Sequence, residues 1–84
     1  MRAMSRVSAK QDKNSNLVHL GKAVRARRKS MALSQEALAD CAELDRSHMG
    51  KIERGERNLS LLNIVRIAQA MECKPSELLI DAGL

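Results

Sequence analysis

The chain has 84 residues, of which 44% are hydrophobic and none is aromatic, and its formal net charge is +5. This length provides one small domain with an aliphatic core and leaves little room for a deep substrate pocket. The absence of aromatic residues argues against modules that bind single-stranded nucleic acid, because those modules stack bases on aromatic rings.

The positive charge is concentrated at the start of the chain. Residues 1–30 hold nine Lys and Arg against Asp12 alone, whereas residues 31–84 hold six basic residues against nine acidic ones. This distribution favours a polyanionic partner. Residues 1–15 are polar and without periodicity, and we expect them to be disordered, as a solvated tail or as an arm on DNA. No apolar stretch suits a secretory signal or a membrane span, so we expect a cytoplasmic protein without a membrane partner.

Two helices are expected between residues 17 and 42. The first ends near Ser30 and has apolar residues at helical spacing, namely Leu17, Leu20, Val24 and Met31. The second begins after Ser34, whose hydroxyl suits the N-cap position. Its inward residues should be Leu38, Cys41 and Ala42.

A third helix is expected between Asp45, an N-cap candidate, and Gly55, which tolerates a left-handed helix C-terminus. At about 100° per residue, one sector of this helix carries donor or small residues: Arg46, Ser47, Gly50, Lys51 and Arg54. Met49 and Ile52 fall opposite and should anchor the helix to the core. Such a helix has the shape needed to enter the DNA major groove, although an ordinary solvated helix shows a similar pattern.

The remaining residues predict two more helices. Ser60 is the expected N-cap of the fourth, whose inward residues should be Leu61, Ile64, Ala68 and Met71. Pro75 suits the first position of a short fifth helix. The apolar residues of this last helix are the expected dimer surface, namely Leu78, Leu79, Ile80 and Leu84.

From about residue 17 to residue 80 the chain resembles the lambda-repressor/Cro-like (Xre) family of helix-turn-helix proteins. The resemblance rests on residues 34–39 (SQEALA) and 51–55 (KIERG), with 20–22 (LGK) upstream and 77–79 (ELL) downstream. It implies an all-α, compact five-helix domain over residues 16–84, with the helix-turn-helix at the second and third helices. It also implies a DNA-binding regulator, since family members are mostly dimeric regulators.

The chain departs from the family pattern at several turns. Glu43 and Ala32 stand where the family commonly has glycine, and Glu72 occupies the comparable turn after the fourth helix. Each costs about 1 kcal/mol if its backbone must be left-handed. Gly50 lies inside the third helix, where it either permits close approach to DNA or is simply a tolerated small residue.

The resemblance also implies roles for individual side chains. The expected base contacts are Arg46, Ser47 and Lys51, and Arg46 can bind guanine through two hydrogen bonds. The expected phosphate contacts are Gln35, His48, Gly50, Arg57 and Asn58. The alternative for Arg46 is a surface salt bridge with Glu43 or a solvated side chain.

Arg28 and Glu53 match family positions that often form an ion pair between the first and third helices. The alternative for Arg28 is a solvated arginine within the basic run that ends the first helix. Removing one partner of a partly buried pair strands a charge, so the pair would affect stability more than specificity.

Nothing in the pattern predicts an enzyme, a metal site or a cofactor. Cys41 and Cys73 have no paired spacing, and His19 and His48 form no ligand cluster with them. We therefore expect both cysteines to be reduced packing residues.

The sequence as a whole favours a homodimeric regulator that binds a (pseudo)palindromic operator in double-stranded DNA, with repression as the simpler outcome. One alternative is a controller protein of a restriction–modification system, because residues 44–47 (LDRS) and 55–58 (GERN) resemble such stand-alone members. Another is an antitoxin-like or adaptor module whose main contact is a protein.

Overall fold

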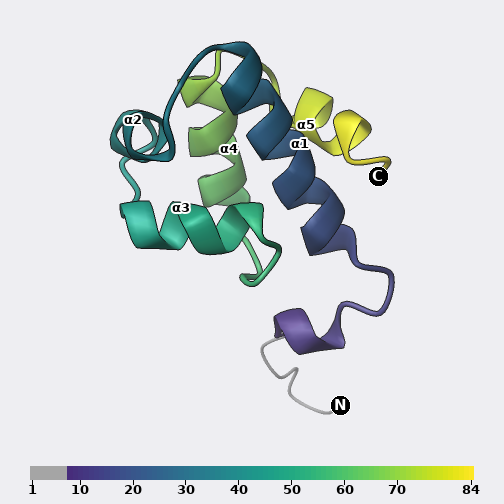
Figure 1. Ribbon diagram of the computed structural model, residues 1–84. Coiled ribbons are helices and arrows are strands. Elements are labelled where there is room, and N and C mark those ends of the chain that lie inside the picture. The colour runs from purple at the N-terminus through teal and green to yellow at the C-terminus, as the bar shows by residue number, and fades with distance from the viewer. Residues whose placement is uncertain (1–7) are drawn as a thin grey trace.

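The computed structural model describes residues 8–84, which fold into helices joined by short turns (Figure 1). In chain order the elements are a 3-10 helix η1 (Ala9–Gln11) and the α-helices α1 (Asn16–Ser30), α2 (Gln35–Cys41), α3 (Arg46–Glu53), α4 (Leu61–Ala70) and α5 (Pro75–Asp81). The expectation of an all-α domain with five α-helices is confirmed for these residues. No helix in this part of the chain is long and apolar enough to span a bilayer.

Local chemistry sets the helix boundaries. The Ser34 hydroxyl accepts a hydrogen bond from the Ala37 amide at 3.0 Å, and Ser60 caps α4 in the same way. Such caps satisfy amides that have no partner inside the helix. Pro75 is the first residue of α5, and Gly55 follows α3 with φ +75°, as expected.

Four non-glycine residues lie in the left-handed region: Ser15, immediately before α1, and one residue in the turn after each of α1, α2 and α4. Ala32, Glu43 and Glu72 have φ of 56°, 58° and 56°. The first two stand at the expected glycine positions, and Glu72 occupies the matching turn after α4. The backbone therefore has the conformation that carries a cost of about 1 kcal/mol for a residue with a Cβ atom.

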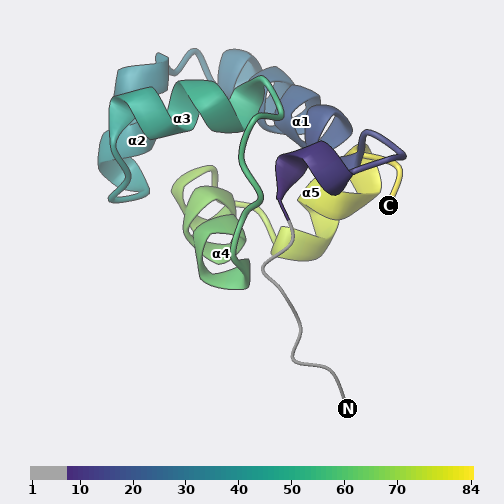
Figure 2. The same cartoon turned by 90° about the horizontal axis from the view of Figure 1, so that it is seen from below.

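Helix α1 packs against both α3 and α5, while α2 packs against α3 and α4, and α4 also contacts α5 (Figures 1 and 2). Gly21 permits the close approach of α1 to α3, since a Cβ atom there would lie 2.5 Å from the carbonyl oxygens of Ile52 and Glu53. The largest fully buried side chains come from all five helices: Val24, Leu38, Met49, Ile52, Ile67 and Leu78.

Two residues expected in the core are exposed instead. Cys41 is exposed because α2 packs against the core through Leu38 and Ala39, with Ala42 buried just after the helix. Leu61 is 72% exposed because α4 is buried through Ile67 and Ala68 in its second half, whereas Leu61 is its first residue. Helical spacing indicates which residues share a face but not where along the helix that face meets its neighbours.

Residues 8–15, which we expected to be disordered, form η1 and the turns that lead into α1. Asp12 Oδ2 accepts a hydrogen bond from the Leu17 amide at 2.8 Å and so fastens this segment to the start of α1. The rest of the expected tail, residues 1–7, lies outside the described residues.

Candidate DNA-binding surface

The inner face of α3 holds the helix against the core, and its outer face is polar. Met49 is 0% exposed and Ile52 is 2% exposed, as their spacing predicts. Arg46, Ser47 and Arg54 are exposed on the opposite side, and Lys51 is partly buried. Four of the five residues expected on this sector therefore remain accessible to a partner.

Gly50 is the exception, because it is buried rather than exposed. A Cβ atom at this position would lie 3.2 Å from Arg54 Nη1 and 3.6 Å from Gln35 Oε1, so two side chains cover the glycine. The expectation that Gly50 lies exposed on this sector is therefore wrong, whereas its proposed phosphate contact stays a prediction.

The start of α3 carries the residues expected to contact bases. The Arg46 side chain is 70% exposed, and its Nη1 lies 3.9 Å from Glu36 Oε2 on α2, so its acidic neighbour is Glu36 rather than Glu43. An exposed ion pair at this distance contributes little to stability, and it leaves the Arg46 guanidinium free to contact a partner. Ser47 Oγ donates a hydrogen bond to Asp45 Oδ2 at 2.6 Å. Asp45 stands at the N-cap of α3 as expected, but its carboxylate accepts this hydroxyl and caps no backbone amide of the helix.

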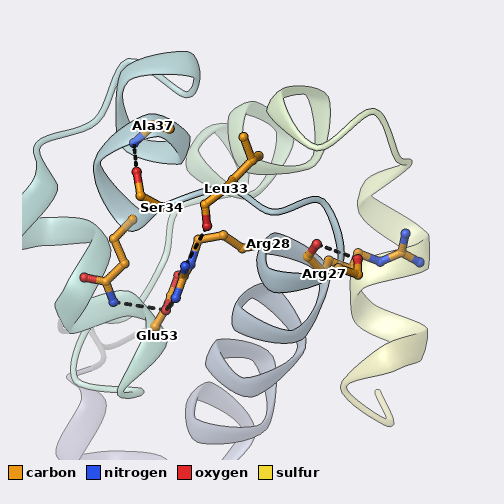
Figure 3. Close-up of polar contacts among 8 residues, drawn as sticks. Arg27, Arg28, Leu33, Ser34, Ala37 and Glu53 are labelled. Carbon is orange, nitrogen blue, oxygen red and sulfur yellow. Dashed lines mark hydrogen bonds and ion pairs between the residues drawn. The ribbon is translucent and has the colours of Figure 1, made fainter.

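Arg28 and Glu53 form a buried ion pair between α1 and α3 (Figure 3). Arg28 Nε donates to Glu53 Oε2 at 2.7 Å, and Nη2 donates to Oε1 at 3.0 Å. Arg28 Nη1 also donates to the Leu33 carbonyl at 2.8 Å, in the turn before α2. The hydrogen bond with Glu53 raises the pKa of Arg28 above its usual value, against the opposing effect of burial.

Gln35, the first residue of α2, joins this pair. Its Nε2 donates to Glu53 Oε1 at 3.1 Å, and the residue is partly buried. An amide nitrogen carries two hydrogens, so one remains for an acceptor outside the protein. The side chain expected to contact a phosphate is thus held in place by the ion pair.

The loop after α3 holds the other expected phosphate contacts. Arg57 and Asn58 are exposed, and His48 is partly buried. Arg54 Nε donates to Glu56 Oε2 at 2.7 Å, and this hydrogen bond lowers the pKa of the Glu56 carboxyl. The loop borders a cavity of about 540 Å³, whose lining residues are Ser8, Ala9, His48, Glu56, Arg57, Asn58, Ser60 and Asn63.

The expected dimer surface is only partly available. Leu78 is 1% exposed and belongs to the core, so its assignment to an interface is wrong, and Leu79 packs against the core. Ile80 and Leu84 are 69% and 55% exposed. Sequence reasoning missed a second exposed apolar pair at the start of α4, Leu61 and Leu62, at 72% and 68%.

The cysteines and histidines of the described residues form no cluster suited to a metal ion. Within residues 8–84 no three His, Cys, Asp or Glu side chains lie close enough to hold a metal ion. Cys73 is partly buried, and this burial raises the pKa of its thiol.

Known proteins are similar to this chain in sequence and in fold. A helix-turn-helix family profile matches residues 24–78. The Control protein C.SmaI of Serratia marcescens is 38% identical over 65 residues, which are 77% of each chain.

Two solved structures extend the comparison. The restriction–modification controller protein C.AhdI from Aeromonas hydrophila is 47% identical, with a TM-score of 0.75 over 76% of this chain and 97% of that one. The controller protein C.Esp1396I, solved as a tetramer in complex with its natural 35 base-pair operator, is 28% identical, with a TM-score of 0.72 over 80% and 92% of the two chains. These matches, together with the polar outer face of α3, show that the chain belongs to the Xre (lambda-repressor-like) helix-turn-helix family of DNA-binding regulators.

Proposed function

We propose that this chain is a controller-type transcriptional regulator that binds a (pseudo)palindromic operator in double-stranded DNA as a homodimer. The single observation that carries the proposal is α3, which is buried through Met49 and Ile52 and presents Arg46, Ser47 and Lys51 away from the core. Controller proteins among its relatives, one of them solved on its operator, favour this role over a general repressor. Such a regulator works beside the DNA, in the cytoplasm.

Each α3 helix enters one major-groove half-site, with the two half-sites about 34–36 Å apart on one face of the duplex. Arg46, Ser47 and Lys51 contact base edges there. The phosphates on either side are held by Gln35 at the start of α2 and by His48, Arg57 and Asn58. Gly50 joins the contact only if the Arg54 and Gln35 side chains that cover it move aside. Occupying the operator would block a promoter that overlaps it.

The dimer uses exposed apolar side chains of α4, of α5 and of the residues that follow α5, and these two helices pack against each other. Ile80 and Leu84 supply one part of the contact, and Leu61 and Leu62 supply the other. Ile80→Glu and Leu62→Glu should each shift the protein towards monomers in sedimentation velocity. Met31→Glu is the matched control, because Met31 is also an exposed apolar residue but follows α1 as its C-cap.

Selection of bound sites from random duplex DNA tests the central claim. The parent chain should enrich a site with two related halves. Arg46→Ala should weaken binding by about 1–3 kcal/mol and relax the preference at one position in each half. Arg66→Ala, which removes an exposed arginine from α4, is the matched control. Enrichment of no site, together with a co-purifying protein partner, would support the adaptor function instead.

The salt dependence gives a second test of the same mechanism. A dimer that neutralises about six to ten phosphates should lose about 10³–10⁵-fold in affinity between 50 and 200 mM salt. An affinity that does not change with salt would contradict binding through these basic side chains.

A further inference from the structure

The cavity beside the α3–α4 loop is lined from two distant parts of the chain. Ser8 and Ala9 come from the N-terminal segment, whereas His48 and Arg57 come from α3 and the loop that follows it. Both ribbon views show η1 beside this loop (Figures 1 and 2). The start of the described chain therefore adjoins the surface that carries the proposed phosphate contacts.

Hydrogen bonds hold this N-terminal segment together. The Ser8 amide donates to Gln11 Oε1 at 2.8 Å, and the Gln11 amide donates to the Ser8 carbonyl at 3.0 Å. The Asp12 carboxylate accepts a hydrogen bond from the Leu17 backbone amide at 2.8 Å, and this bond connects the segment to α1. These hydrogen bonds order residues 8–12, of which Ser8 and Ala9 line the cavity.

The charges around the cavity suit an anion. Glu56 is the acidic residue in its lining, and Arg54 pairs with that carboxylate at 2.7 Å, whereas Arg57 forms no ion pair among the described residues. Lys10 and Lys13 are exposed in the adjoining segment, and neither forms an ion pair within residues 8–84. Neutral donors complete the lining, namely the hydroxyls of Ser8 and Ser60 and the amide of Asn63.

We propose that this cavity binds a backbone phosphate of DNA and that residues 8–13 complete the site. The DNA-binding surface then continues from α3 across the α3–α4 loop to the N-terminal segment. Charged donors that neutralise a phosphate raise affinity without reading sequence. This inference rests on the proposed DNA-binding function and adds a contact that the helix-turn-helix alone does not supply.

Ala9 offers a size-matched test in the full-length chain. Ala9→Glu places a carboxylate in the cavity, and Ala9→Gln places a neutral side chain of the same size there. At about 100 mM salt the glutamate variant should bind the selected duplex roughly tenfold more weakly than the glutamine variant, and the gap should narrow as salt screens the repulsion. Equal affinities would overturn the proposal, and so would tighter binding by the glutamate variant.

A second variant changes only exposed side chains and so keeps the fold. Lys10→Ala with Lys13→Ala should flatten the plot of log affinity against log salt by about 0.9 for each phosphate that is no longer neutralised. Lys74→Ala, on the turn before α5, is the control. A parental slope for the double variant would refute the role of residues 8–13. Failure of the parent chain to select any duplex would instead reject the proposed function itself.

Discussion

Replacing Arg28 with alanine should destabilise this protein severely, because it removes three hydrogen bonds from one buried side chain. Two of them go to Glu53, at 2.7 and 3.0 Å, and the third goes to the Leu33 carbonyl at 2.8 Å. The Glu53 side chain is only 2% exposed. In the variant its carboxylate would keep one protein donor from this network, Gln35 Nε2 at 3.1 Å.

Stranding a buried charge in this way costs about 3–5 kcal/mol. A chain of this length has a total stability of about 4–12 kcal/mol, so the loss is a large fraction of the whole. Since 1 kcal/mol corresponds to roughly 4–8 °C in a domain of this size, the melting temperature should fall by roughly 12 °C or more.

Thermal denaturation followed by circular dichroism measures this effect, and two further variants identify its cause. Arg28→Lys keeps the charge but loses the bidentate hydrogen bonding, so its melting temperature should lie between those of the parent and Arg28→Ala. Arg28→Met combined with Glu53→Leu leaves no stranded charge and should be more stable than Arg28→Ala. At a temperature where Arg28→Ala is still folded, its ranking of DNA sites should match that of the parent. Equal melting temperatures for Arg28→Ala and the parent would refute this reasoning.

Three other changes have defined outcomes. Glu43→Gly should raise the free energy of unfolding by about 1 kcal/mol, since it relieves a left-handed backbone, whereas Glu43→Ala should show no such gain in chemical denaturation. The hydrogen bond from Arg54 lowers the pKa of Glu56 in the folded chain. The stability that this pair contributes is therefore present above the unfolded pKa of Glu56 and is lost as the pH falls through the folded pKa. Arg54→Ala should raise the midpoint of the Glu56 titration measured by NMR. Iodoacetamide should modify the exposed Cys41 before Cys73, whose burial raises its thiol pKa, and mass spectrometry of timed samples would show the reverse order if this is wrong.

Local chemistry could be predicted from the sequence wherever a residue acts on its own neighbours. Ser34 and Ser60 cap helices that begin one residue later, and Gly55 takes the left-handed conformation after α3. Pro75 begins α5 because its ring suits a helix start and it lacks an amide hydrogen. Each of these features depends on a few adjacent residues and is therefore visible in a single sequence.

Burial was harder to predict, because it depends on which helix lies opposite. Periodicity placed Leu61 and Cys41 on inner faces, but α4 is buried through its second half and α2 through Leu38 and Ala39. Gly50 falls on the polar sector of α3 by spacing alone. Its burial requires the positions of side chains from α2 and from the end of α3, which a helical projection does not contain.

The polar network connects three helices behind the proposed DNA-binding surface. Arg28 reaches from α1 to Glu53 on α3 and to the turn before α2, and Gln35 brings α2 to the same carboxylate. A buried ion pair is weak evidence for net stability, because desolvation offsets much of the attraction. Its hydrogen bonds are directional, however, and apolar contacts alone permit helices to slide past each other more freely. The same carboxylate that anchors α3 also accepts a hydrogen bond from the Gln35 amide, so the packing of α2 against α3 and the position of a proposed phosphate donor are set together.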